Sequence, residues 1–409
     1  MKDGGDRRSR PILTMTIDTK SRTRSQPLRL AILTLCFSAM LLSANLATPL
    51  YAVWAKQFGF STAVLALIFG VYALVLIPSL MLFGQLSDRL GRRIVIAIGL
   101  GLAALASTMF ALANGVAWLF AARATLGVAQ GTLSGAATAA LAETVPDGEA
   151  REAALLATLA QSGGSAAGVV LSGILAEWLA PRALPFIVGI VVCALTVAAL
   201  RYVPETTQRH PGPLTIRRPR VPRDVRAGFL RTGLTAAAVW SVAALFLSVM
   251  PSYAGQLVLH TDNLALLALT AALILIASCV TQLAARHAGH AAESQAVGLS
   301  LLALGLLGLV LSSPLHSPAL LVLGGVLAGV GHGLASLAAQ DDLTRLAPPE
   351  ERGEVSAAFY VCIYLGVSVP VIGIGALAVA TTLFTAVTTF AVVTGGYALA
   401  LAAWHWRRR

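Results

Sequence analysis

Twelve apolar runs, separated by short polar segments, govern what this chain can fold into. Each run approaches the roughly 20 residues that an α-helix needs to cross the hydrocarbon core of a bilayer. The runs therefore predict an all-α polytopic membrane protein with twelve transmembrane helices. The spans are expected at about residues 29–54, 62–84, 94–113, 117–142, 152–178, 184–203, 228–250, 264–285, 293–312, 318–340, 353–377 and 382–405.

Composition agrees with this class and excludes a soluble one. Charged residues make up 11% of the chain and hydrophobic residues 57%, whereas an ordinary soluble domain carries about 25% charged residues. The net charge of +11 comes from clusters in residues 1–29, 201–231 and 407–409. These clusters lie in predicted loops and tails, where they can touch anionic lipid heads, and not on one amphipathic face. We therefore expect no nucleic-acid partner.

Positive charge is divided unequally between the two predicted sides of the membrane. One side holds only Lys56 and Arg182 outside the helix cores, and the other holds the remaining loop and tail cations. Since Lys and Arg accumulate on the cytoplasmic side, both termini are expected in the cytoplasm of a protein in the cytoplasmic (inner) membrane. The first apolar run is too long for a signal-peptide core, so we interpret it as a retained helix.

A proline-rich, basic segment divides the chain in two. Its density of proline and charge argues against a packed core. The expected organisation is a cytoplasmic tail at 1–28, a six-helix bundle at 29–203, a cytoplasmic linker at 204–227, a second six-helix bundle at 228–405 and a basic tail at 406–409.

The two bundles carry a weak internal repeat. Residues 127–131 match 329–333 at an offset of 202, and at the same offset Pro146 matches Pro348. Two parallel halves around a cavity at the bilayer midplane are a recurrent transporter design. The repeat therefore favours two pseudo-symmetric six-helix bundles.

The loop at 84–93 is the most informative short segment. It places one acid, Asp88, and three arginines between the second and third spans. A carboxylate at the edge of the hydrocarbon needs a donor or a cation, which Arg89 or Arg92 can supply. Gly84 and Gly91 permit a tight turn and a close backbone approach.

This loop resembles the signature between the second and third helices of the major facilitator superfamily of transporters. The resemblance implies that Asp88 pairs with Arg92 and with Glu143, and that it caps the helix beginning near Glu354. It also implies a conformational latch that closes the cytoplasmic side and breaks during alternating access. The residues of this expected latch are Gly84, Asp88, Arg89, Gly91, Arg92 and Glu143.

The fourth span contains Arg123, the one Lys or Arg well inside an apolar run. A buried arginine is functional by default, because it is costly unless paired or hydrated; snorkelling to the outer interface is the alternative. Arg123, Gly127, Gln130 and Gly131 resemble the fourth-helix motif of proton-linked facilitators, which implies a part in proton movement. The glycines also allow close helix packing.

The fifth span contains Gly164, Gly168 and Gly173. Residues 168–173 resemble the exporter motif Gly-Pro-x-x-Gly-Gly, but Val169 replaces the proline and Ser172 replaces a glycine. The resemblance implies antiport, and the two departures leave the direction of transport open. Small-residue packing of helices is the plainer interpretation of the glycines.

Further polar residues inside the apolar runs are candidates for the cavity wall. His332 stands in the tenth span where Gln130 stands in the fourth, and a histidine there could titrate. Each of these side chains could instead form a hydrogen bond between helices. The candidates for proton coupling or the substrate cavity are Arg123, Gln130, His332, Asn45, Gln161, Tyr72, Tyr360 and Tyr364.

Some chemistries have no basis in the sequence. It contains no Gly-x-x-x-x-Gly-Lys-Ser/Thr phosphate loop, no Cys/His metal spacing and no convincing catalytic cluster. No Asp or Glu lies deep in a predicted span, so coupling would have to use Asp88, Glu143, Asp341 or His332. We expect no enzyme activity, cofactor or metal.

Together these features predict a monomeric secondary transporter of the drug or small-metabolite exporter type, with a small-molecule substrate, protons and the lipid bilayer as partners. The substrate would bind between two halves that rock to expose it alternately. A sugar or metabolite importer on the same fold is the first alternative. A receptor or scaffold that does not transport is the second.

Overall fold

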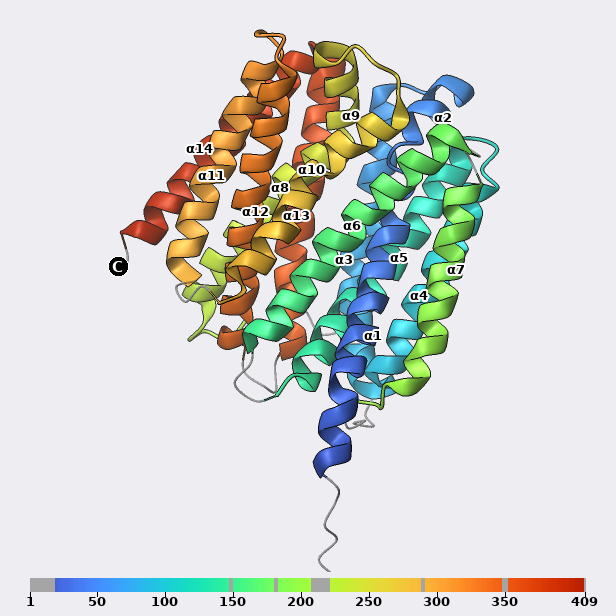
Figure 1. Cartoon of the computed structure of the whole chain (residues 1–409), viewed down its shortest axis with the longest axis vertical. Coiled ribbons are helices and arrows are strands. Elements are labelled where there is room, and N and C mark those ends of the chain that lie inside the picture. Colours follow the sequence, from blue (N-terminus) through green and yellow to red (C-terminus); the bar gives the residue numbers. More distant parts are fainter. Residues whose placement is uncertain are drawn as a thin grey trace, which may run out of the picture.

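The computed structural model describes residues 19–146, 150–179, 183–206, 221–287, 291–347 and 352–407. Within them the chain forms fourteen α-helices packed as a bundle (Figure 1). Their bounds are α1 Thr19–Asn45, α2 Tyr51–Phe58, α3 Thr62–Leu90, α4 Arg92–Ala111, α5 Val116–Thr144, α6 Ala150–Trp178, α7 Leu184–Ala199, α8 Arg226–Ser248, α9 Met250–Tyr253, α10 Leu264–Ala284, α11 Ala291–Ser312, α12 Pro318–Leu346, α13 Arg352–Ala380 and α14 Leu383–Trp406. Short 3₁₀ turns lie at η1 Leu200–Tyr202 and η3 Ala285–His287, and a π-helical turn lies at η2 Ala254–Val258.

Twelve of these helices are long, and only α2 and α9 are short. Ten of the long helices are apolar and long enough to cross a membrane, and α3 holds a shorter apolar stretch at Leu67–Phe83. The twelfth, α5, is more polar because it carries Arg123, Gln130 and several hydroxyl residues. These helices confirm the predicted all-α membrane fold.

Two spans are broken near a proline, close to the ends that the sequence predicts for them. The sequence predicts that the first span runs to residue 54, but α1 ends at Asn45 and α2 begins at Tyr51 after a turn that contains Pro49. Proline lacks a backbone N–H and disfavours helix in the residue before it, which explains the break. Likewise α8 ends at Ser248, and Pro251 lies in the first turn of α9.

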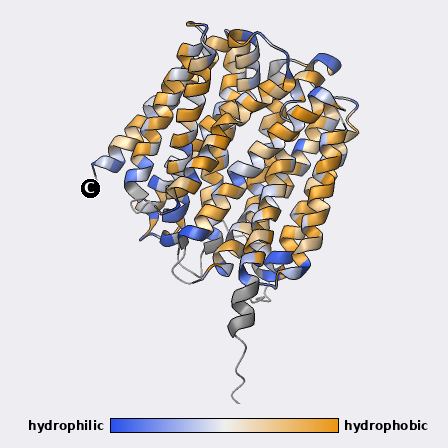
Figure 2. Cartoon of the chain, viewed as in Figure 1, coloured by the Kyte–Doolittle hydropathy of each residue, from blue (hydrophilic) through white to orange (hydrophobic). Residues whose placement is uncertain are grey.

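The outside of the bundle is apolar along its length. Figure 2 shows apolar colouring over most of the helices and hydrophilic colouring gathered toward the two ends. Large aliphatic side chains point outward, among them Leu74, which is 71% exposed, and Val392, which is 68% exposed. Such a surface would be unfavourable in water, so it fits contact with lipid tails.

The buried side chains form two hydrophobic clusters. One is built mostly from α1–α7, the N-terminal helices, and the other mostly from α8–α14, the C-terminal helices. The two groups meet along two seams, where α6 packs on α10 and α3 packs on α13. Between these seams lies the site.

Candidate functional site

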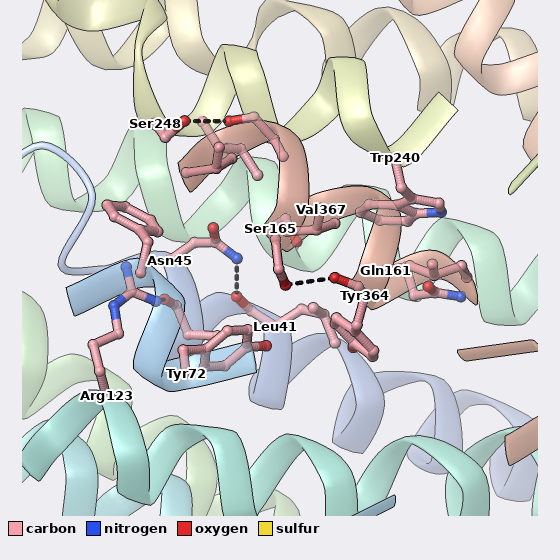
Figure 3. A pocket seen from close by; sticks show the side chains of 17 residues that line it. Leu41, Asn45, Tyr72, Arg123, Gln161, Ser165, Trp240, Ser248, Tyr364 and Val367 are labelled. Atoms are coloured by element: carbon pink, nitrogen blue, oxygen red, sulfur yellow. Dashed lines mark hydrogen bonds between the residues drawn. The ribbon is translucent and has the colours of Figure 1, made fainter. Parts of the chain in front are cut away.

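A pocket lies between the N-terminal and the C-terminal helices, near the middle of the bundle (Figure 3). Its wall combines aromatic and aliphatic side chains with a few polar groups, as small-molecule sites commonly do. The lining residues come from α1, α3, α5, α6, α8 and α13: Leu41, Ala44, Asn45, Phe69, Tyr72, Arg123, Gln161, Ser165, Trp240, Ala244, Leu247, Ser248, Ile363, Tyr364, Val367, Ser368 and Val371.

The space inside this pocket is small. About 90 Å³ is open to the centre of a water molecule. A single water needs about 10–15 Å³ by the same measure, so the pocket holds several waters and no drug-sized molecule. A larger guest would therefore require the walls to move apart.

Arg123 is the one charged side chain among the described residues that line the pocket. It is 4% exposed. Its Nε donates to the hydroxyl of Tyr51, and its Nη1 lies 3.3 Å from the carbonyl oxygen of Ala44. The guanidinium carbon lies 4.5 Å from the ring centre of Phe69 and 5.6 Å from that of Tyr72. Aromatic faces thus surround the cation.

Some of the residues predicted for the cavity line it, namely Arg123, Asn45, Gln161, Tyr72 and Tyr364. Asn45 donates through Nδ2 to the carbonyl of Leu41, 2.8 Å away, and Gln161 donates to the carbonyl of Ala157 at 3.4 Å. The side-chain oxygens of both amides therefore remain available to the pocket. Gln130, Tyr360 and His332 are buried, and none of them belongs to the lining.

Gln130 and Tyr360 instead join α5 to α13. Nε2 of Gln130 donates to the hydroxyl of Tyr364 at 2.9 Å. The hydroxyls of Thr138 and Tyr360 lie 2.7 Å apart. These bonds cross between the N-terminal and the C-terminal helices, and Tyr364 also lines the pocket.

His332 belongs to a second buried polar network. Its Nδ1 lies 2.9 Å from the hydroxyl of Ser278, which also accepts from Nε2 of Gln282. The same Gln282 amide donates to Ser162 of α6 at 3.3 Å. The ring of Trp240, a pocket residue, meets the His332 ring edge-on with centroids 5.2 Å apart. This network therefore also crosses between the two groups of helices.

At the end of the bundle that carries Arg92, which we call the Arg92 end, polar contacts surround a buried guanidinium. Nη2 of Arg92 lies 3.0 Å from Oε1 of Glu143, and Nη1 donates to Ser87. The backbone N–H of Arg92 donates to Oε1 of Glu205 at 2.6 Å, so Glu205 caps the start of α4. Thr206 donates to the other oxygen of Glu143 at 2.6 Å. The segment after α7 is thereby held against the loop that contains residue 91.

A second set of contacts at the Arg92 end joins the two groups of helices. Arg151, at the start of α6, donates to the carbonyl oxygens of Ala285 and Arg286, 2.8 Å away in each case. Its Nη1 also lies 3.3 Å from Oδ2 of Asp341, which is 1% exposed. Arg345 donates to the same carboxylate at 3.1 Å from one turn further along α12. Asp341 is thus paired with two arginines.

The opposite end, which we call the Lys56 end, is hollowed. A pocket of about 410 Å³ lies there between α2, α9, η2 and the start of α10, and it shares Ser248 with the central pocket. Tyr51, the partner of Arg123, also lines it. Lys56 and Asp262 form an exposed pair at its rim, 3.7 Å apart. The hollow therefore adjoins the central pocket at Ser248.

The predicted latch and packing residues lie along α3 to α6. Gly84 and Arg89 lie near the end of α3, and Gly91, with φ +100°, separates α3 from α4. The side chain of Asp88 lies outside the described residues. The pairing of Asp88 and its expected cap on the helix beginning near Glu354 therefore stay predictions. Glycines of α5 and α6 approach neighbouring backbones: Gly127 at Tyr72, Gly131 at Leu76, Gly164 at Ser38, Gly168 at Leu42 and Gly173 at Leu264.

Several residues of the site are missing from the sequence-based prediction. Tyr51 follows Pro49 inside an apolar run. A tyrosine hydroxyl buried there needs a hydrogen-bond partner, so the sequence could have marked Tyr51 as a candidate. Glu205 stands in a polar segment with no periodicity, so nothing in the sequence singles it out. The sequence marks Arg151 only as a loop cation, although it is the residue that joins α6 to Asp341.

A polytopic helical membrane protein with a central, mostly apolar pocket is the class that this fold and site define. The family model described as Major Facilitator Superfamily matches residues 33–371. The chain belongs to this superfamily.

Two curated relatives match part of the chain. It is 34% identical to the multidrug efflux pump LfrA of Mycolicibacterium smegmatis over 144 residues, which cover 35% of this chain and 29% of that protein. It is 29% identical to the methyl viologen resistance protein SmvA of Salmonella typhimurium over 195 residues, or 47% and 39% of the two chains. The chain thus matches less than half the length of either relative.

Solved structures show the same fold across nearly the whole chain. The human organic anion transporter MFSD10 (TETRAN) superposes with a TM-score of 0.70 at 18% identity, covering 92% of this chain and 99% of that one. A POT family transporter in complex with 5-aminolevulinic acid superposes with a TM-score of 0.74 at 13% identity, covering 92% and 96%.

Proposed function

We propose that this member of the superfamily is a secondary transporter that exports a small organic molecule across the cytoplasmic membrane by alternating access. One observation carries the proposal. A pocket lined by both groups of helices is closed toward the Arg92 end by contacts between those groups, and it neighbours a hollow at the Lys56 end. A site reachable from one end at a time is what alternating access requires.

The distribution of charge supports the orientation. The positive-inside rule assigns the Arg92 end to the cytoplasm, because loop arginines gather there and Lys56 stands at the opposite end. The conformation would then face outward. Export rather than import is favoured by the names of LfrA and SmvA, an efflux pump and a resistance protein.

The proposed latch has two parts. The first part would comprise Gly84, Asp88, Arg89 and Gly91 of the loop with Arg92 and Glu143, and the last two join α4 to α5, both N-terminal helices. Arg151 and Asp341 join N-terminal to C-terminal helices. Opening the cytoplasmic end must separate Arg151 from Asp341, whereas the Arg92–Glu143 pair could move as a unit with its own helices.

Proton coupling is part of the proposal, and Arg123 would not carry the proton itself. A guanidinium stays protonated at physiological pH, so it can only set the charge of the empty pocket. The coupled proton needs a titratable group, and His332 is such a group in direct contact with the pocket residue Trp240.

Purified protein in proteoliposomes tests the function. We expect accumulation of at least one member of a panel of organic anions, neutral drugs and methyl viologen when a pH gradient is the only driving force. Collapse of the gradient should stop accumulation but leave exchange of labelled for unlabelled substrate. If no panel member exchanges, although the protein remains folded, the transport proposal fails. If accumulation does not depend on the pH gradient, the proposal of proton coupling fails, but the proposal of transport stands.

A further inference from the structure

The charge of Arg123 is not balanced by any carboxylate in the described part of the chain. Its Nε and Nη1 have the neutral partners Tyr51 and Ala44, and its Nη2 is buried with no hydrogen-bond partner. In the sequence, every Asp and Glu lies outside the interior of the apolar runs. A buried cation in a membrane normally pairs with an acid or with water.

The guanidinium of Arg123 belongs to the wall of the pocket. Figure 3 shows the guanidinium of Arg123 turned into the pocket near Tyr72 and Asn45. Nε donates to Tyr51 and Nη1 to Ala44, so Nη2 is the donor without a partner. Each of the two Nη atoms carries two N–H groups, so together they can still donate to the two oxygens of a carboxylate.

The rest of the described wall supplies no negative charge to pair with a positive group. The other polar side chains of the pocket are amides, serines and tyrosine hydroxyls, all neutral or able to donate. A cationic guest would lie beside the fixed charge of Arg123 at low dielectric, which is repulsive. An anionic guest would be attracted to Arg123, because no carboxylate of the described residues pairs with that cation.

The apolar part of the wall indicates the remainder of the guest. Leu247 and Trp240 of α8 and Ile363, Val367 and Val371 of α13 face the pocket from the C-terminal helices, whereas Arg123 comes from the N-terminal side. A molecule with an acidic head and an apolar body could contact both walls at once.

We propose that Arg123 is the recognition site for a carboxylate or a similar planar oxyanion on the transported molecule, so that the substrates are amphipathic organic anions. This inference rests on the proposed function and narrows its substrate class. It also sets the chain apart from a carrier built for dications such as methyl viologen.

Binding to the full-length protein in lipid nanodiscs tests the inference without transport. Three probes of matched shape are titrated by calorimetry: 2-naphthoate, the neutral 2-naphthamide and the cationic 2-naphthylmethylammonium. We expect naphthoate to bind at least 10-fold more tightly than the amide, and the ammonium to bind more weakly than the amide.

Two variants assign the preference to one residue. Arg123→Gln should abolish the difference between naphthoate and naphthamide, whatever its effect on the affinity for the amide. Lys56→Gln removes a cation whose side chain is 80% exposed at the rim of the hollow, and it should keep the preference. A preference lost equally in both variants would indicate a general field effect and overturn the assignment to Arg123.

The ranking of the probes on the wild-type protein decides the matter even if Arg123→Gln does not fold. Equal affinity for the anion and the amide, or tightest binding of the ammonium, overturns the inference whatever the transport assay gives. Conversely, an intact anion preference without transport in proteoliposomes would leave the binding site standing and refute the transport proposal.

Discussion

Arg151 and Glu177 stand at opposite ends of α6 and fasten it to the two ends of α10. Arg151 donates to the carbonyls that follow the last turn of α10, and Glu177 accepts from the backbone N–H of Leu264, 2.7 Å away, at its first turn. A cation at the C-terminus and an anion at the N-terminus both complement the dipole of α10. The α6–α10 seam is thus held at both ends. A further pocket of about 270 Å³ lies along the other seam, between Leu65 of α3 and Ile374 of α13.

Loss of the Arg151 contacts should release the Arg92 end. In Arg151→Gln the buried carboxylate of Asp341 keeps only Arg345, and the carbonyls after α10 lose their donor. Hydrogen bonds that involve a charged group are worth about 1.5–3 kcal/mol each. We therefore expect faster amide hydrogen exchange at η3 and at the start of α6, together with at least a 10-fold fall in the rate of substrate exchange.

Arg345→Gln is the matched control for this variant. Arg345 bonds the same carboxylate, but it lies on the same helix and its side chain is 62% exposed. A pair of that kind is worth about 0.3–0.5 kcal/mol. Exchange at η3 should stay close to wild type in this variant. A similar acceleration in both variants would mean that the seam responds to any loss at the Asp341 carboxylate and not to the Arg151 contacts in particular.

Glu205 explains why residue 91 is glycine. The φ of +100° and ψ of 146° at Gly91 suit only glycine well, and a Cβ there would lie 2.6 Å from Cδ of Glu205. Gly91→Ala should therefore both strain the turn and displace the cap of α4. Backbone strain costs about 1–3 kcal/mol, and a lost cap costs about 0.5–2 kcal/mol. We therefore expect the free energy of unfolding to fall by about 2–4 kcal/mol.

A double-mutant cycle separates the two causes. Glu205→Ala alone should cost about 1 kcal/mol, and its combination with Gly91→Ala should be less than additive, since the cap can be lost only once. Gly59→Ala is the control for strain alone, because Gly59 also has a positive φ but a Cβ added there would meet no atom within 4 Å. Additive effects in unfolding titrations would contradict contact between Glu205 and residue 91.

The sequence is sufficient for the fold but not for the partners of its charges. Apolar runs of helical length report on lipid contact directly, because every spanning backbone must bond internally. Arg92 and Glu143 can be paired from sequence only through the family resemblance, and the structure places them 3.0 Å apart. The caps by Glu205 and Glu177 depend on how loops fold back on the bundle, which no periodic pattern records.

The cavity residues show a similar limit. The sequence identifies polar side chains inside spans, but it does not give the rotation of each helix about its axis. Asn45 and Gln161 therefore reach the pocket wall as expected, whereas His332 points to Ser278 and Tyr360 to Thr138. Arg123 stands out in the sequence because a deep cation in an apolar run is rare wherever it points.

The two tyrosines of α13 should separate closure from binding. Tyr364→Phe and Tyr360→Phe each remove a hydrogen bond to α5, worth about 1 kcal/mol, and should favour opening of the Arg92 end about 5-fold. Only Tyr364 also lines the pocket. Only Tyr364→Phe should therefore weaken naphthoate binding by more than the change in the opening equilibrium explains. Tyr397→Phe, which loses a bond within the C-terminal helices, should change neither exchange at α5 nor affinity.

Two glycines of α5, one turn apart, make the last prediction a test of close packing. A Cβ at Gly131 would lie 2.8 Å from both the carbonyl oxygen of Leu76 and the backbone N of Leu80, whereas a Cβ at Gly135 would meet nothing within 4 Å. Backbone atoms cannot give way as a flexible side chain can, so Gly131→Ala must push α3 and α5 apart. Overpacking of this kind costs about 1–3 kcal/mol, and Gly135→Ala should be neutral or stabilise the helix by up to about 1 kcal/mol. Unfolding titrations in mixed micelles measure both. Phe69 and Tyr72 of α3 also line the pocket. Gly131→Ala should therefore weaken binding of the naphthoate probe as well. A destabilised variant with unchanged affinity would show that α3 and α5 can separate without moving the pocket wall.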